Sequence, residues 1–243
     1  MKRRELLGVI GGAAAWPLVV RAQQAALPIM GFMDSGSPGP NTQLVVALKQ
    51  GLNESGYVEG QNLLIEYRWA EGNYGRLSEL ATDLVRRQVA VIVATGGEPS
   101  GRAARAATST IPIVFDAGGS PVEQGMVASL NRPGGNMTGV NQMAEELVTK
   151  ELGLLHELVS KARVVGVLVE PNNAARSDAI VKNAQTAVSA LGCTMEVLAA
   201  GSDEGIDKAF DTLAQKHIGA LFVGPNAFFY NRRDRIIALA SDK

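Results

Sequence analysis

Short apolar runs alternate with amphipathic segments along nearly the whole chain, and this alternation constrains the fold more than any other feature. The runs are almost wholly apolar, which is typical of strands that are covered on both faces. The segments between them carry Leu at helical spacing, as Leu44, Leu48 and Leu52 do. Strand–helix–strand repetition predicts parallel sheets joined by right-handed crossovers, so we expect an α/β fold. The expected strands are 29–32, 63–69, 89–94, 113–115, 164–169, 194–198 and 220–223, and the clearest expected helices are 42–54, 77–85 and 179–191.

The order of elements in the first half of the chain returns in the second half. In both halves a helix ends near a Leu and a Gly, a strand and a helix follow, and the next strand ends in a Gly-containing loop. This repetition favours two similar lobes, although any α/β chain resembles itself at this level of detail. A turn-rich stretch at 132–136 marks the boundary. We expect an N-terminal lobe over 23–140 and a C-terminal lobe over 141–243, with the crossing at 141–145.

Residues 1–22 have the three parts of a secretory signal peptide. Residues 2–4 form a basic head, residues 6–20 form an apolar run, and residues 20–22 end it in a small-x-small pattern. The run is shorter than the roughly 20 apolar residues that a membrane span needs, so we expect export without a membrane anchor. The two adjacent arginines also resemble a twin-arginine signal. These features predict a periplasmic protein, the alternative being a basic N-terminus on a cytosolic one.

The composition of the chain without residues 1–22 excludes several classes of protein. Removal of the signal takes four of the 23 basic and one of the 24 acidic residues, which leaves a formal charge of −4. That charge gives no sign of nucleic-acid binding, which requires a clustered basic face. Cys193 is the only cysteine, so there is no disulfide framework, and we interpret it as a small buried hydrophobe beside a strand. His156 and His217, each on an expected helix, are too few for a zinc site, so we expect neither metal nor cofactor.

The ends of the expected strands are small and polar. In open parallel sheets, ligands bind at the carboxyl ends of the strands, where Gly exposes backbone amides and Ser and Asn add short hydrogen bonds. Asp116 directly follows the run 113–115 and is suited to an ammonium or a hydroxyl group. Such loops are rich in Gly, Asn and Ser in any α/β protein, and core packing is the alternative for an aromatic residue. The candidate ligand-binding residues are Ser35, Gly36, Gly97, Glu98, Asp116, Asn172, Asn173, Asn226 and Phe228.

The familiar catalytic signatures are missing from the sequence. There is no Gly-x-Ser-x-Gly elbow and no phosphate loop ending in Gly-Lys-Ser or Gly-Lys-Thr. The glycines at 8–12 lie inside the signal and are no dinucleotide fingerprint. We therefore expect a binding protein and not an enzyme.

Several short motifs, taken together, resemble one known family. They are residues 59–62, 65–68, 107–108, 111–115 and 171–173, and most specifically residues 125–140 with Arg132-Pro133-Gly134-Gly135-Asn136. Together with the basic head and the Gly- and Ala-rich signal, they resemble the exported solute receptors of the ABC-transporter substrate-binding family related to the tryptophan-binding protein TrpX. The likeness covers the whole chain. Ser120-Pro121-Val122 stands where the family tends to have Asp-Pro-Val, so no cation contact is carried over to that position.

The resemblance implies a bilobed periplasmic-binding-protein fold of type I, with two Rossmann-like lobes that close on a small molecule by hinge bending. Family members continue past Lys243, and only one helix follows the run 220–223 here, so we expect a second lobe that is truncated at its C-terminus. The implied ligand is an amino acid or an aromatic compound, and the implied partner is an ABC permease in the inner membrane.

Three other functions compete with this interpretation. A sensory binding module for a membrane receptor would use the same cleft, and an adjacent permease and ATPase in the genome would argue against it. A secreted α/β enzyme is disfavoured because no nucleophile–base pair is evident. A transcription regulator of the same fold would need an N-terminal helix-turn-helix in place of the signal.

Overall fold

The computed structural model describes residues 27–241 of the 243-residue chain, so the expected signal at 1–22 lies outside the described residues. The first lobe is built on one parallel sheet with the strand order β2-β1-β3-β4-β5. Its elements are β1 (Ile29–Asp34), α2 (Thr42–Glu54), β2 (Leu64–Trp69), the 3-10 turn η2 (Tyr74–Arg76), α3 (Leu77–Arg86), β3 (Val91–Thr95), α4 (Glu98–Ala107), β4 (Ile113–Ala117) and β5 (Met137–Asn141).

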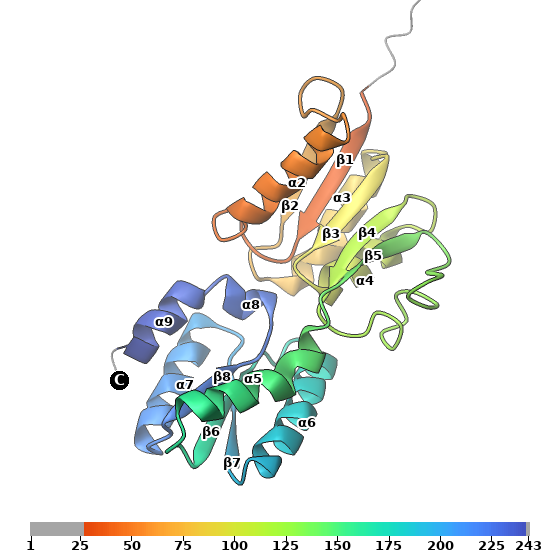
Figure 1. The fold of residues 1–243 in the computed structure, drawn as a ribbon. Coiled ribbons are helices and arrows are strands. Elements are labelled where there is room, and N and C mark those ends of the chain that lie inside the picture. Colours follow the sequence, from red (N-terminus) through yellow and green to blue (C-terminus); the bar gives the residue numbers. More distant parts are fainter. Residues whose placement is uncertain (1–26, 242–243) are drawn as a thin grey trace, which may run out of the picture.

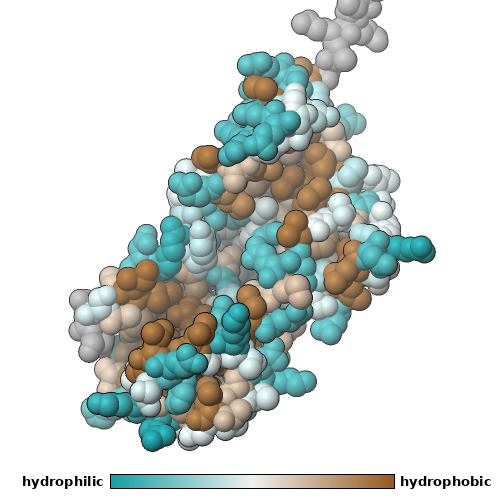
Figure 2. All heavy atoms as spheres, in the orientation of Figure 1, coloured by the Kyte–Doolittle hydropathy of each residue, from teal (hydrophilic) through white to brown (hydrophobic). Residues whose placement is uncertain are grey.

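Helices α3 and α4 cover one face of this sheet and bury its main core. Leu84 on α3 packs so closely over Gly31 that a β-carbon there would touch its side chain. Helix α2 lies in front of the opposite face, beside β1 and β2 (Figure 1). Beyond α2 that face is open, and Val114 and Val140 are 38% and 64% exposed. The expectation that the strands are covered on both faces is therefore wrong for β4, and the additional strand β5 is exposed there too. Hydrophobic side chains gather on this face beside α2 (Figure 2).

The second lobe has a smaller parallel sheet with the order β7-β6-β8. Helices α5 and α6 cover one face of it, and α7, α8 and α9 cover the other, so β6 in the middle is almost wholly buried. The elements are α5 (Ala144–Leu158), β6 (Val164–Val169), α6 (Ala174–Ala190), β7 (Thr194–Ala199), α7 (Asp203–Gln215), β8 (Ala220–Val223), α8 (Ala227–Tyr230) and α9 (Arg233–Ser241).

The expected α/β fold with parallel sheets is confirmed. Each of the seven expected strands overlaps an observed one, and β5 adds an eighth where a short apolar run precedes the crossing. The chain leaves the first sheet after Asn141 and enters α5 of the second lobe at Ala144 (Figure 1). Met143 makes this turn in the left-handed region, with φ of 54°. Among residues 27–241, no helix has the length and apolar character needed to cross a bilayer.

Candidate functional site

A cavity of about 660 Å³ lies where the carboxyl ends of the two sheets face each other. The first lobe contributes residues that follow β1, β3 and β4, and the second contributes the start of α6 and the segment from β8 to α9. Both sheets are parallel, so all their strand ends and the helix starts that follow them meet at one edge. The topology therefore makes this cavity from loops that are far apart in the sequence.

Asp116 marks the polar side of the cavity. Its Oδ1 accepts a hydrogen bond from the backbone N of Gly97 at 3.2 Å, and its Oδ2 accepts one from Nε2 of Gln142 at 3.2 Å. Burial raises the pKa of Asp116 to about 6, and the nearby carboxylates of Asp34 and Glu98 act in the same direction. The charge of Arg176 acts against this rise, but no ion pair to Asp116 forms among residues 27–241.

Asp34 organises the loop after β1 and is almost fully buried. Its Oδ1 accepts hydrogen bonds from the backbone N of Gly36 at 2.6 Å and from Nδ2 of Asn41 at 3.2 Å. Its Oδ2 accepts one from Oγ1 of Thr95 at 2.7 Å, which ties the ends of β1 and β3 together. Burial raises the pKa of Asp34, although these hydrogen bonds oppose the rise. We interpret its role as structural, because protein donors already surround it.

The two lobes touch across the cavity through polar side chains. Nη1 of Arg176 in the second lobe lies 2.6 Å from Oε1 of Glu98 in the first, and both side chains are buried. Nδ2 of Asn41 donates to Oδ1 of Asn231 at 3.2 Å. Two longer side-chain hydrogen bonds also join the lobes, from Arg102 to Asn173 at 3.4 Å and from Tyr74 to Asn226 at 3.5 Å.

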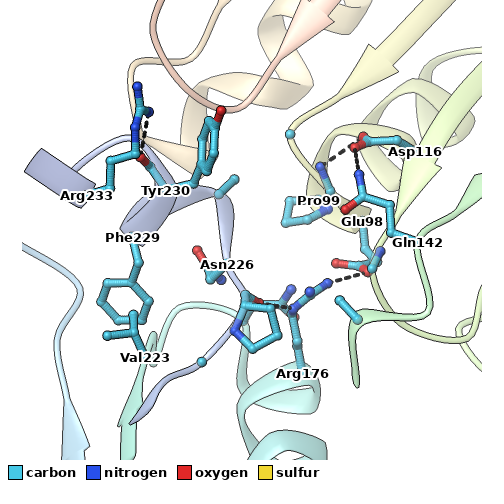
Figure 3. Close-up of a pocket in the computed structure, with 18 of the residues that line it drawn as sticks. Glu98, Pro99, Asp116, Gln142, Arg176, Val223, Asn226, Phe229, Tyr230 and Arg233 are labelled. Carbon is cyan, nitrogen blue, oxygen red and sulfur yellow. Dashed lines mark hydrogen bonds and ion pairs between the residues drawn. The ribbon is translucent and has the colours of Figure 1, made fainter. Parts of the chain in front are cut away.

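The opposite side of the cavity is apolar and aromatic. Phe229 and Tyr230 on α8 face it, with Val223 at the end of β8 and Ile236 on α9. The guanidinium of Arg233 lies 4.7 Å from the ring centroid of Tyr230. In Figure 3 Val223, Phe229 and Tyr230 lie across the cavity from Asp116 and Glu98. The cavity thus has one polar and one apolar side.

The structure brings five of the nine sequence-predicted residues to the cavity: Gly97, Glu98, Asp116, Asn173 and Asn226. Asn226 also caps α8, because its Oδ1 accepts a hydrogen bond from the backbone N of Phe228 at 2.7 Å.

The other four predicted residues, Ser35, Gly36, Asn172 and Phe228, are not among those that line the cavity. Ser35 donates to the carbonyl of Gly96, and Gly36 packs against Asn231. The backbone N of Asn172 donates to Glu170. Phe228 packs in the second-lobe core, with its ring 5.3 Å from that of Phe229.

Several cavity residues escaped the sequence analysis, namely Asn41, Tyr74, Gln142, Arg176 and Arg233. For Arg176, one feature of the sequence could have indicated a role. It lies in the first turn of α6, where the helix dipole disfavours a cation, so a nearby carboxylate was to be expected. No sequence pattern identifies Glu98, on the other lobe, as that carboxylate.

The lone cysteine is buried beside β7, as expected. Its Sγ lies 3.7 Å from Nδ1 of His156 on α5, far from the cavity. His217 lies in the turn after α7 with φ of 51°, so the expectation that it is helical is wrong. Within the part of the chain that the structure describes, no three His, Cys, Asp or Glu side chains cluster as metal ligands.

Comparison with known proteins agrees with this architecture. The model of the family described as ABC transporter substrate binding protein matches residues 39–237. The chain belongs to this family. It is a family of substrate-binding proteins and not of enzymes. Over 119 residues the chain is 34% identical to a tyrosine-binding protein of Clostridioides difficile (strain R20291). That match covers 49% of this chain and only 34%, about a third, of the relative's length.

Two solved structures show the same fold. A conserved domain protein from Vibrio cholerae O1 biovar eltor superposes with a TM-score of 0.79 at 24% identity, over 88% of this chain and 71% of that one. An ABC domain from Streptococcus pneumoniae in complex with L-Trp superposes with a TM-score of 0.73 at 20% identity, over 89% of this chain and 72% of that one. At these identities the likeness establishes the periplasmic-binding-protein fold of this family member.

Proposed function

We propose that the protein is an extracytoplasmic receptor of an ABC importer and that it captures an aromatic amino acid or a related aromatic compound between its lobes. The observation that carries this proposal is the two-sided cavity, with Asp116 on one side and Phe229 and Tyr230 on the other. Its volume of about 660 Å³ falls within the range of roughly 300–1,000 Å³ typical of small-molecule sites.

The polar side suits the head group of an amino acid. An ammonium placed against Asp116 would pair with a half-buried carboxylate that forms no ion pair among residues 27–241. Helices α4 and α6 both begin at the cavity, and the positive ends of their dipoles favour a carboxylate there. Asn173 and Asn226 add neutral donors and acceptors for orientation.

The apolar side suits an aromatic ring. Tyr230 is 54% exposed and offers its ring to a ligand, whereas Phe229 lines the cavity from the second-lobe core. An aromatic pair contributes about 0.5–1.5 kcal/mol beyond its buried area. The tyrosine-binding relative and the L-Trp complex of a structural neighbour agree with such a ligand. The signal-like segment at 1–22 and the family membership agree with periplasmic capture and delivery to a permease.

A thermal-shift panel of amino acids and aromatic acids on the full chain tests this function. A solute at 100 times its dissociation constant stabilises the folded form by about 2.7 kcal/mol, which corresponds to an upward shift in Tm of roughly 5–10 °C. We expect the largest shift with tyrosine or tryptophan and none with glucose. A panel in which sugars shift Tm and aromatic amino acids do not would contradict the proposal.

The affinity for an ammonium-bearing solute should fall as the pH drops below about 6. Above its pKa of about 6 Asp116 is already ionised, whereas below it a proton must leave before the ammonium can bind. The dissociation constant should therefore rise by about tenfold between pH 7.5 and pH 5. Titration calorimetry at the two pH values measures this change. Benzoate, which has no ammonium, should not lose affinity on acidification, and an amino-acid affinity that is independent of pH would remove Asp116 from this role.

A further inference from the structure

The carboxylate of Glu98 occupies a cradle that both lobes build. Its Oε1 accepts hydrogen bonds from the backbone N of Gly118 and of Gly119, each at 2.9 Å, and from Nη1 of Arg176 at 2.6 Å. Gly118 and Gly119 follow β4 in the first lobe, whereas Arg176 lies on α6 of the second. Figure 3 shows Arg176 paired with Glu98. The cradle is therefore complete only when the lobes meet.

Arg176 is also held by its own lobe while it pairs with Glu98. Its Nε donates to the carbonyl of Pro225, just after β8, at 2.8 Å. Its guanidinium lies close to Gly118, where any β-carbon would clash with it. The side chain is 7% exposed. The second lobe thus holds the cation of Arg176 in a fixed position against Gly118 and Glu98 of the first lobe.

Three donors that converge on one carboxylate oxygen form the kind of site in which proteins bind a carboxylate ligand. Burial disfavours the charged form of Glu98, but Arg176 and the two glycine amides outweigh it and lower the pKa of Glu98 below its usual value. Among the ion pairs of residues 27–241, only this one joins the lobes and has both side chains less than 10% exposed.

We propose that this cradle is a carboxylate-binding site that Glu98 fills in cis, and that this internal carboxylate holds the two lobes together in the absence of solute. The carboxylate of Glu98 then joins the two lobes, as the carboxylate of a bound ligand would do in the same cradle. Arg176 is consequently not available to the solute, whose head group meets Asp116 and the helix starts instead. The proposal does not depend on which solute the cavity takes.

Solution scattering of the solute-free Glu98→Ala variant tests this proposal. Removal of the carboxylate leaves the Arg176 cation buried without a partner, and separation of the lobes lets water solvate it without unfolding either core. The variant should have a larger radius of gyration than the parent protein. Added formate should enter the vacated cradle and return the radius of gyration to the parent value, whereas chloride at equal ionic strength should not.

Asp83→Ala is the matched control. Asp83 pairs with Arg68 at the same distance of 2.6 Å, but both residues belong to the first lobe. This variant should leave the radius of gyration unchanged with or without formate. If Glu98→Ala remains as compact as the parent, or if formate acts equally on the control, the proposal is wrong.

The proposal can still be tested if Glu98→Ala fails to fold. In that case formate should restore its far-ultraviolet circular dichroism, and Glu98→Gln, which keeps an acceptor for the glycine amides but loses the charge, carries the scattering measurement. A larger radius of gyration for Glu98→Gln than for the parent protein supports the proposal that Glu98 holds the lobes together. A compact Glu98→Gln, together with an alanine variant that formate does not restore, overturns it.

Discussion

Replacement of Gly118 with alanine is expected to keep the lobes apart and to weaken solute binding by about 10- to 100-fold. A β-carbon on Gly118 would overlap the guanidinium of Arg176, and overpacking of this kind costs about 1–3 kcal/mol. The backbone of Gly118 is not in the left-handed region, so alanine is tolerated there when the lobes are apart. The clash therefore penalises only the form in which the lobes meet, and the apparent affinity falls with the population of that form.

Titration calorimetry and solution scattering of Gly118→Ala measure the two consequences. Tm of the solute-free protein should change little, because the three atoms nearest to the added β-carbon all belong to Arg176 and not to a core side chain. Gly39→Ala is the matched control, since Gly39 lies in a loop at the same sheet edge and a β-carbon there meets nothing within 4 Å. A Gly118→Ala protein that binds as tightly as the control would show that close contact of the lobes is not needed for binding.

Replacement of Asp116 with asparagine should weaken the binding of an aromatic amino acid by about 10- to 100-fold. The change keeps the shape of the side chain and the hydrogen-bond acceptor for Gly97 but removes the charge. Hydrogen bonds to a charged group contribute about 1.5–3 kcal/mol, which corresponds to this range. The dependence of affinity on pH near 6 should disappear in the same variant, because the titrating group is gone.

Titration of Asp116→Asn with two solutes separates a binding role from a structural one. Benzoate lacks the ammonium and should bind the variant and the parent equally well, whereas tyrosine should lose affinity. Asp211→Asn is the control, because Asp211 is an exposed carboxylate on α7 outside the cavity. Equal losses for both solutes would show that Asp116 shapes the cavity and does not contact an ammonium.

The fold could be predicted from the sequence to the extent that local patterns determine it. The runs at 164–169 and 220–223 match β6 and β8 residue for residue. Both strands are apolar because helices cover both faces of the second sheet, although β8 lies at its edge. The exposed side of β4 and β5 could not be predicted in this way. Val114 lies in the same kind of apolar run, and whether a helix covers it depends on the arrangement of distant segments.

In the candidate site, too, features set by neighbouring residues could be predicted, whereas contacts between distant segments could not. The polar loop residues Gly97 and Asp116 could be selected because every parallel sheet presents its strand ends at one edge. The partner of Glu98 could not, because Arg176 is 78 residues away and the two meet only across the hinge. Phe228 follows the last expected strand in the sequence, but the orientation of the short helix α8 decides that Phe228 does not reach the cavity, whereas Phe229 and Tyr230 line it.

Titration calorimetry of the solute-free protein with L-tyrosine, L-tryptophan, L-alanine and benzoate at about pH 7.5 tests the central claim most directly. The two-sided cavity predicts one site per chain that binds an aromatic amino acid more tightly than L-alanine, which lacks the ring, and more tightly than benzoate, which lacks the ammonium. The heat-capacity change should be negative, because apolar surface is buried. If neither aromatic amino acid binds, or if L-alanine binds as tightly as they do, the assignment of the two sides of the cavity is contradicted.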